Sequence, residues 1–244
     1  MGTKIKNDGT PVTDLDNSTL TALRNQIHTY FPNDYTIGEE DQKSDGQIKE
    51  ILERQNEYQW TIDGLDGTGN YRMGANSYGS MISRRRGNAI LFSAIFLPID
   101  EALRQNGFHY AEHGEGAWQW CGECQVFHKL SSAKEGSLER VVVMLEGSSK
   151  KFFKPPVSRL GTVVTTRPGL SSCAAAMAVA RGRASAFVTV ENKPWDNWPT
   201  WLLIQEAGGV VTDWRGNTCV PENCGNMVAS GNRKDHDQIL KLLS

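Results

Sequence analysis

Residues 60–71 join a short apolar run, two carboxylates and a glycine-rich turn, and they restrict the fold and chemistry of this chain more than any other stretch. Trp60–Ile62 is typical of a β-strand. Asp63 and Asp66 follow, three residues apart, and Gly67–Gly69 comes directly after them. Carboxylate oxygens are ligands that suit Mg²⁺. Backbone N–H groups at a glycine turn or helix start suit an anion such as phosphate.

The simpler interpretation of these carboxylates is an acidic turn in contact with water, because Asp and Gly are common turn formers. A metal site therefore needs further carboxylates from other parts of the chain. Glu39 at the end of a predicted strand and Asp16 at the start of a predicted helix are candidates. Asp196, in a predicted turn just ahead of a helix, is a third, although its position alone is more typical of a helix cap.

Length and charge restrict the class of protein. A chain of 244 residues can form one large domain or two smaller ones around a shared core. The net charge is −2, and the only basic cluster, Arg84–Arg86, is predicted to be an exposed hairpin tip rather than a nucleic-acid site. No apolar run reaches the roughly 18 residues of a membrane span, and the N-terminus lacks a signal-peptide core. We expect a cytoplasmic protein that binds neither nucleic acid nor membranes.

Five cysteines, an odd number, and the lack of a signal peptide favour reduced thiols. Cys121 and Cys124, with His128 nearby, could be half of a zinc site. The chain offers no second Cys-x-x-Cys motif, and the flanking residues alternate like paired strands. A hairpin turn is therefore favoured, and any chemical role of Cys121 and Cys124 stays open.

The chain divides into two predicted halves that share a core. Residues 1–128 form an antiparallel sheet flanked by helices and carry most of the candidate carboxylates. Residues 129–244 form an α/β half that supplies Asp196 and substrate contacts. The main predicted helices cover residues 17–31, 45–52, 171–180 and 197–207, and the first begins at a cap on Asn17 or Ser18. The main predicted strands cover residues 35–38, 60–62, 76–97 as a hairpin, 186–190 and 210–212.

Several short motifs occur in a fixed order and together resemble the inositol monophosphatase family of Mg²⁺-dependent, lithium-sensitive phosphatases. The motifs are Ile37–Glu40, Asp63–Thr68, and Trp195-Asp196 followed by Glu206–Gly209. Pro11–Asp16 and Tyr110–Ala117 are similar to two further motifs of that family. Each piece is weak alone, but the ordered set is specific and extends over nearly the whole chain.

The resemblance implies a fold and a set of site residues. The fold is a mixed α and β, layered α-β-α-β-α sandwich, of the type also found in fructose-1,6-bisphosphatases. Two or three Mg²⁺ ions would be held by Glu39, Asp63, Asp66, Asp196 and the carbonyl oxygen of Leu65. Asp16 would lie beside the metals. Glu39 and Thr68 would orient the attacking water, Asp63 would bridge two metals, and Asp66 and Asp196 would lie on the leaving-group side. The N–H groups of Gly67 and Thr68 would hold the phosphate of the substrate.

The implied activity is hydrolysis of a phosphate monoester of a small polyol or sugar, similar to inositol 1-phosphate. Histidinol phosphate, fructose 1,6-bisphosphate and 3′-phosphoadenosine nucleotides are the alternatives within the superfamily. A non-catalytic relative that binds a ligand is the alternative of a different class. The resemblance also implies a homodimer, and the partner is a small phosphorylated metabolite.

Three departures from the family pattern bear on these expectations. Gly64 stands where the family usually has proline, so we expect a looser turn. In the family, a further helix normally precedes the loop at which this chain begins. Thr189 stands where inositol-specific members often have a substrate-binding glutamate, and Glu191 is the nearest replacement. Arg167, Arg181 and Arg183 are candidates for substrate contacts, although a solvated surface role is favoured for each.

Overall fold

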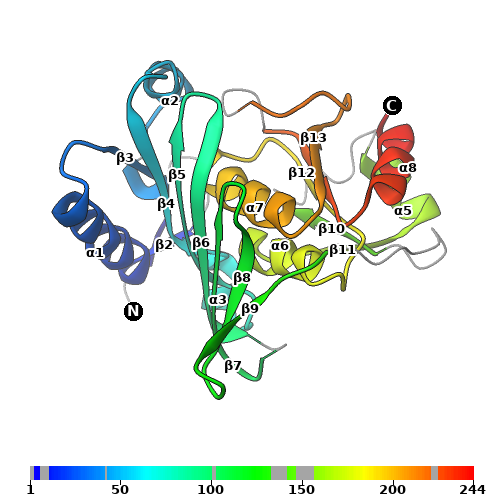
Figure 1. The fold of residues 1–244 in the computed structure, drawn as a ribbon, viewed down its shortest axis with the longest axis horizontal. Helices are drawn as coiled ribbons and strands as arrows, with labels where there is room; N and C mark the ends of the chain where they lie inside the picture. The colour runs from blue at the N-terminus through cyan, green and yellow to red at the C-terminus, as the bar shows by residue number, and fades with distance from the viewer. Residues whose placement is uncertain are drawn as a thin grey trace.

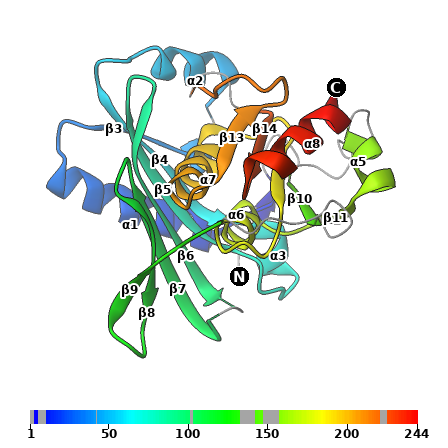
Figure 2. The same cartoon turned by 45° about the vertical axis from the view of Figure 1, so that its right-hand side comes forward.

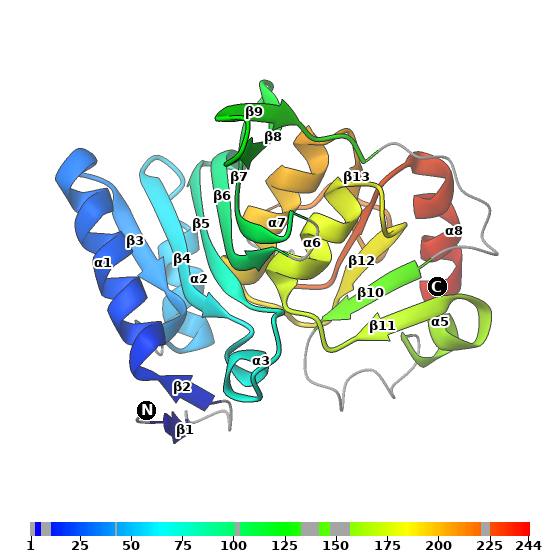
Figure 3. The same cartoon turned by 90° about the horizontal axis from the view of Figure 1, so that it is seen from below.

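Alternating layers of helix and sheet make up the computed structural model, which describes residues 3–5, 11–41, 43–100, 103–132, 142–146, 157–220 and 225–244. Figure 1 shows the ribbon, and Figure 3 shows the layers edge-on. In order they are helix α1, a seven-stranded sheet, helices α6 and α7, a five-stranded sheet, and helices α5 and α8. These helices are α1 (Asp14–Tyr30), α5 (Val157–Val163), α6 (Ser172–Ala180), α7 (Pro194–Glu206) and α8 (Arg233–Leu243). The predicted α-β-α-β-α sandwich is confirmed.

The seven-stranded sheet is an antiparallel meander with one parallel edge. From β4 to β9 each strand pairs antiparallel with the next, as predicted, whereas β3 lies parallel to β4. The strands are β3 (Tyr35–Gly38), β4 (Tyr58–Asp66), β5 (Gly79–Arg86), β6 (Ala89–Asp100), β7 (Gln105–Glu112), β8 (Gly116–Cys121) and β9 (Val126–Lys129). The parallel edge places the ends of β3 and β4 side by side.

The five-stranded sheet has the order β11-β10-β12-β14-β13. Its strands are β10 (Val142–Glu146), β11 (Thr165–Pro168), β12 (Ala186–Thr189), β13 (Val210–Asp213) and β14 (Met227–Ser230). Five short elements complete the described chain: β1 (Thr3–Ile5) pairs with β2 (Pro11–Thr13), and η1 (Glu39–Asp41), α2 (Asp45–Leu52) and α3 (Thr68–Arg72) are helical. None of the described helices has the length and hydrophobicity needed to cross a membrane.

Strand alternation explains the layering, because successive side chains point to opposite faces of a sheet. Phe187 of β12 packs in the core around α6 and α7, while its neighbours Ala186 and Val188 pack under α5 and α8. Figure 2 shows α5 and α8 on that far side. The core around α6 and α7 contains residues from both sheets, and the proposed boundary between residues 128 and 129 stays a prediction.

Helix α1 covers the outer face of the seven-stranded sheet. Its residues Leu20 and Ile27 pack against Trp60 and Ile62 of β4. The prediction that this helix begins at Asn17 or Ser18 was wrong, because it begins at Asp14 with Thr13 as its N-cap residue. The side chain of Asp16, three residues on, accepts the Thr13 N–H at 2.8 Å, and this contact closes the first turn.

The basic cluster of the β5–β6 hairpin is only partly exposed. Arg86 is exposed, as predicted, but Arg85 is fully buried. The guanidinium group of Arg85 donates to Gln59 Oε1 at 2.9 Å and to the carbonyl oxygen of Leu52 at 2.5 Å, and it stacks on the Trp198 ring at 4.8 Å. The prediction of an exposed cluster was wrong for Arg85, because α2 and α7 cover this arm of the hairpin.

The prediction of reduced thiols holds for only part of the cysteine set. Cys121, Cys124 and Cys173 are free. Cys219 is disulfide-bonded, so the prediction was wrong there.

The buried position of Arg85 predicts a large effect on stability. Arg85→Ala removes the guanidinium group and leaves its buried hydrogen-bond acceptors without a donor. We therefore expect a loss of about 2–4 kcal/mol in the free energy of unfolding. Arg86→Ala, at the exposed neighbouring position, is the control and should cost about 1 kcal/mol or less. Urea denaturation of both variants measures the difference. Equal losses would contradict the role given to Arg85.

Candidate metal centre

Parallel pairing of β3 and β4 brings two of the predicted ligands together. Gly38 is opposite Ile62 in this pairing, so Glu39 and Asp63 follow at the same end of adjacent strands. Close packing fixes this end, because a Cβ atom on Gly38 would overlap the side chain of Leu20. Glu39 begins the short helix η1, and its carboxylate interacts with that of Asp63.

A β-bulge in β4 brings Asp66 to the same side as Asp63. In a regular strand, residues three apart point to opposite faces. Asp63 is opposite Met81 and Asp66 is opposite Gly79, so β4 has one more residue than β5 between these pairs. The extra residue reverses the alternation, which turns both carboxylates toward α6. There Asp66 accepts the backbone N–H groups of Ser172 at 3.2 Å and Cys173 at 2.7 Å.

The turn after β4 positions Thr68. Gly67 has φ of +82°, and a Cβ atom there would lie 2.7 Å from the carbonyl oxygen of Ser77, so glycine is required. Thr68 begins α3 and is buried. Its hydroxyl group lies 2.7 Å from Asp16 Oδ1 and 3.0 Å from the carbonyl oxygen of Leu65, and it can donate its single proton to either acceptor.

Asp16 holds Thr68 in place instead of joining the carboxylate cluster. Its Oδ2 atom accepts the N–H of Thr13 at 2.8 Å and the Thr13 hydroxyl group at 2.5 Å, and its Oδ1 atom faces Thr68. The side chain is completely buried. The expectation that Asp16 lies beside a metal centre stays a prediction.

Asp196 is both a helix-capping residue and a member of the cluster. Helix α7 begins at Pro194, so Asp196 lies in the first turn of the helix. The prediction that Asp196 lies in a turn ahead of the helix was wrong. One carboxylate oxygen accepts the N–H of Lys193 at 3.1 Å. Carboxylate oxygens of Asp63, Asp66 and Asp196 all lie within 4.8 Å of one another, a separation that one divalent cation can bridge.

Burial and mutual repulsion make this cluster unfavourable without a cation. Burial raises the pKa of Asp63 well above its ordinary value, and the nearby Glu39, Asp66 and Asp196 carboxylates raise it further. Burial also raises the pKa of Asp66, although hydrogen bonds from Cys173 and Ser172 oppose this shift. The donor set therefore fits a hard divalent cation, which would stabilise the charged forms.

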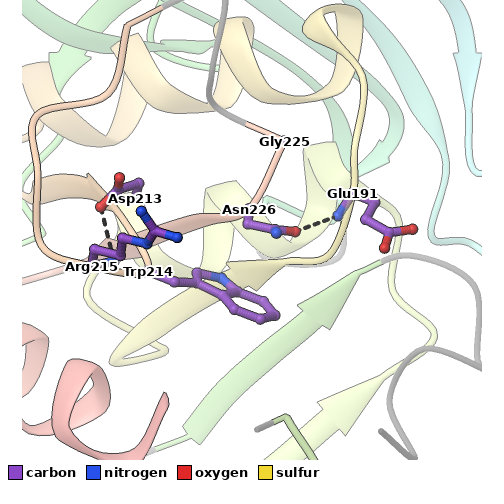
Figure 4. A pocket seen from close by; sticks show the side chains of 6 residues that line it. All are labelled: Glu191, Asp213, Trp214, Arg215, Gly225 and Asn226. Carbon is purple, nitrogen blue, oxygen red and sulfur yellow. Dashed lines mark hydrogen bonds between the residues drawn. The ribbon is translucent and has the colours of Figure 1, made fainter. Parts of the chain in front are cut away.

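A cavity of about 430 Å³ lies along the loop that precedes Asp196. It is lined by Glu191, Asp213, Trp214, Arg215, Gly225 and Asn226. In Figure 4, Asn226 lies between Glu191 and the turn after β13, and its side chain accepts the Glu191 N–H at 2.7 Å. Glu191 has φ of +55°, an uncommon conformation for a residue with a side chain.

Thr189 does not face this cavity. It is buried, donates its hydroxyl proton to the carbonyl oxygen of Gly225 at 3.2 Å and accepts the N–H of Met227 at 3.0 Å. Glu191 lines the cavity, and its replacement of the substrate-binding glutamate of the family stays a prediction. The sequence did not identify Asp213, Trp214 and Asn226, because they come from a separate hairpin with no local motif.

Arg181 is committed to a structural ion pair. It binds Asp100 through both terminal nitrogens, at 3.0 and 2.5 Å, and donates from Nε to Gln119 Oε1 at 2.8 Å. The side chain of Arg167 lies outside the described residues. Arg183 lines a second cavity, of about 410 Å³, next to Arg181.

Comparison with known proteins gives one family and several similar relatives. The profile of the inositol monophosphatase family matches residues 2–244. A histidinol-phosphatase of Chlorobaculum parvum is 31% identical over 240 residues, with 96% of this chain and 84% of the relative covered. The solved structure of a Thermotoga maritima IMPase has a TM-score of 0.79 at 25% identity, with 100% and 87% covered. That of an IMPase/NADP phosphatase complexed with Mg²⁺ and phosphate has a TM-score of 0.81 at 22% identity, with 100% and 86% covered, and shows the fold alone.

The chain belongs to the inositol monophosphatase family. The family resemblance inferred from the ordered motifs is therefore confirmed. At the level of enzyme class, the prediction of a phosphoric monoester hydrolase is confirmed as well.

Gly64 departs from the expected proline for a packing reason. It is buried within β4, where a Cβ atom would lie 2.5 Å from the carbonyl oxygen of Asp16 and 3.0 Å from the backbone nitrogen of Leu20. The expectation of a looser turn at Gly64 was wrong, because α1 approaches the strand closely at this point.

This close approach predicts that Gly64 cannot accept even a methyl group. We expect Gly64→Ala to lower the free energy of unfolding by about 1–3 kcal/mol, because the backbone of α1 must move. Gly69→Ala is the matched control, since no atom lies within 4 Å of a Cβ at that helical position. It should leave stability unchanged or raise it by about 0.5–1 kcal/mol. Denaturant titration of the pair tests the contrast, and equal stability of the two variants would refute it.

Proposed function

We propose that this protein is a Mg²⁺-dependent phosphomonoesterase that acts on a small phosphorylated polyol or sugar. The main support is the convergence of Asp63, Asp66 and Asp196 from distant parts of the chain into one cluster, in which Asp63 and Asp66 are buried and Asp196 is half-buried. In the proposal these three carboxylates, Glu39 and the carbonyl oxygen of Leu65 hold two or three Mg²⁺ ions. The homodimer, the sensitivity to lithium and the cytoplasmic location stay predictions.

Bound Mg²⁺ would neutralise the charge of a phosphate dianion and lower the pKa of a coordinated water. Thr68 would orient that water. Its hydroxyl proton is directed to Asp16 or to the Leu65 carbonyl oxygen, so its lone pairs can accept a proton of the water. Asp16 accepts two further hydrogen bonds from Thr13 and stays fixed. Glu39, beside Asp63, would accept the second proton of the same water.

Asp66 and Asp196 would define the leaving-group side of the centre. Both are anchored at helix N-termini, Asp66 through the first residues of α6 and Asp196 through Lys193 of α7. These anchors hold the carboxylates without using mobile side chains, which favours a fixed geometry. The N–H groups of Gly67 and Thr68 would bind the phosphate oxygens, as the family resemblance implies.

The cavity at Glu191 is the candidate binding site for the alcohol part of the substrate, because its loop leads directly into Asp196. Polar groups of Glu191, Asn226 and Asp213 suit the hydroxyl groups of a polyol. Fructose 1,6-bisphosphate and 3′-phosphoadenosine nucleotides carry a second phosphate, for which the cavity offers one lining arginine, Arg215.

Histidinol phosphate is the second candidate substrate, and the carboxylates of the same cavity favour it. Its amine and imidazole groups suit Glu191 and Asp213, with Trp214 beside them. Burial acts to raise the pKa of Asp213, but hydrogen bonds from Asn217 and the backbone of Arg215 outweigh it and lower that pKa. The similarity to a histidinol-phosphatase over 96% of the chain supports this candidate.

A ligand-binding relative without activity is less well supported. Such a protein would gain nothing from two buried carboxylates and a half-buried one that repel one another.

The metal assignment predicts a complete loss of activity on removal of one carboxylate. We expect Asp63→Asn to abolish Mg²⁺-dependent phosphate release and to remove the rise in melting temperature caused by Mg²⁺. Asp14→Asn, which changes an exposed aspartate in the first turn of α1, is the control and should keep both. Full turnover by Asp63→Asn would refute the centre. If Mg²⁺ raises the melting temperature of the unmutated protein but the protein hydrolyses no monophosphate, the ligand-binding alternative is favoured.

A substrate panel separates the two candidate substrates. We expect turnover of histidinol phosphate or of inositol 1-phosphate, measured as phosphate release with Mg²⁺. Glu191→Gln should raise the KM for the true substrate about 10-fold, the effect of weakening one charged hydrogen bond. Glu57→Gln, at an exposed site in the turn before β4, should leave KM unchanged. An unchanged KM in Glu191→Gln would exclude this cavity as the alcohol site.

A further inference from the structure

The far end of the β8–β9 hairpin carries three potential metal ligands that the phosphatase chemistry does not use. Cys121 ends β8, Cys124 lies in the turn, and His128 lies in β9. Cys124 and His128 are exposed, and Cys121 is half-buried. Figure 1 shows this hairpin at the edge of the sheet that is farthest from β3. Strand β9 of this hairpin is the fifth strand beyond β4 in the sheet, and neighbouring strands are about 4.8 Å apart.

Strand pairing turns Cys121 and His128 to the same face of the hairpin. His128 is opposite Gln119, and Cys121 is two residues beyond Gln119 on the same strand. Directly paired residues share a face, as do residues two apart, so the Cys121 and His128 side chains are diagonal neighbours. The predicted hairpin turn is confirmed, and it is the turn that brings these residues together.

The turn itself folds Cys124 back over Cys121. The Gln125 N–H donates to the carbonyl oxygen of Cys121 at 2.9 Å, and Gln125 adopts φ of +55°. The Gln125 side chain donates to the carbonyl oxygen of Gly122 at 2.6 Å and closes the loop. The Cys124 N–H donates to Cys121 Sγ at 3.2 Å. A hydrogen bond from the backbone to a sulfur stabilises the thiolate form that binds metals.

The separation of the ligand atoms is close to that of a zinc site. Both sulfur atoms and a ring nitrogen of His128 lie within 4.8 Å of one another. Tetrahedral zinc with bonds of about 2.3 Å to sulfur and 2.0 Å to nitrogen places its ligands about 3.5–3.8 Å apart. Small rotations of exposed side chains cover the remaining difference.

We propose that Cys121, Cys124 and His128 form a zinc-binding site at the end of the β8–β9 hairpin, with the fourth position open to solvent. Two thiolates and a neutral imidazole match the charge and softness of Zn²⁺, and they disfavour Mg²⁺. Each thiol releases its proton on binding. The carboxylate cluster has the opposite preference, so the protein carries two sites that select different metals.

The site would fasten the edge of the seven-stranded sheet. Strand β9 is the last strand of that sheet, and all four of its residues are exposed. A metal held by β8, the turn and β9 links the edge strand to its neighbour without requiring a buried core. The proposal does not depend on the substrate or on the activity of the carboxylate centre.

Cobalt titration of the reduced, full-length protein tests the proposal. Tetrahedral Co²⁺ bound to thiolates has visible d–d bands and a sulfur-to-cobalt charge-transfer band, which carboxylate-bound Co²⁺ lacks. We expect one equivalent of Co²⁺ to develop the charge-transfer band and Zn²⁺ to displace it. Zn²⁺ should also protect Cys121 and Cys124 from alkylation, measured on each peptide by mass spectrometry.

Variants locate the site. Cys121→Ser and Cys124→Ser should each lose at least half of the charge-transfer intensity and bind Co²⁺ more weakly. His128→Ala should weaken binding at least about 10-fold, the loss that even an outer partner of a metal ligand produces. His28→Ala, at an exposed position on α1, is the imidazole control and should leave the titration unchanged.

Two results would overturn the proposal. One is the absence of a charge-transfer band in protein whose Cys121 and Cys124 thiols are shown to be free. The other is an unchanged titration in Cys124→Ser or His128→Ala. Thermal unfolding of each variant without metal shows that it is folded, since the three side chains lie outside the core. Loss of phosphatase activity in Asp63→Asn with the cobalt bands intact would separate the two sites.

Discussion

The repulsion among three clustered carboxylates, two of them buried, is the constraint around which the rest of this structure is arranged. Asp63, Asp66 and Asp196 lie within 4.8 Å of one another, and burial raises the pKa of the first two. Such a cluster destabilises the folded protein when no cation is bound. Rigid elements therefore hold each carboxylate: a bulged strand holds Asp63, and the N-termini of α6 and α7 hold Asp66 and Asp196.

Helix capping and the proposed site chemistry use the same carboxylate groups. Asp16 and Asp196 each lie three residues after an N-cap residue and accept its N–H. The two interpretations considered for Asp196, a cap or a ligand, are therefore compatible. Capping fixes one oxygen of each carboxylate. The same arrangement in Asp16 fixes Thr68, so a local rule of helix stability places a residue beside the centre.

Local patterns in the sequence predicted most elements and the members of the cluster, but not how they converge. Hydrophobic alternation predicted the meander, and the ordered motifs predicted the layers. Alternation could not show that β4 contains an extra residue, which alone puts Asp63 and Asp66 on one side. It could not show that α2 and α7 bury Arg85, or that α1 requires a glycine at position 64. The cavity at Glu191 also depends on a distant hairpin. Each of these features arises from contacts between distant segments, which no local pattern encodes.

The parallel pairing of β3 with β4 and the position of Asp196 have a consequence for folding kinetics. Strands β4 to β9 pair with their sequence neighbours, so their loops are short and close early. Asp196 reaches Asp66 only after α7 docks, across a segment of more than 100 residues. We therefore expect the cluster to be completed late, when Asp196 joins the carboxylates of Asp63 and Asp66. A cation present at that step would remove the repulsion, so folding and metal loading are expected to be coupled in time.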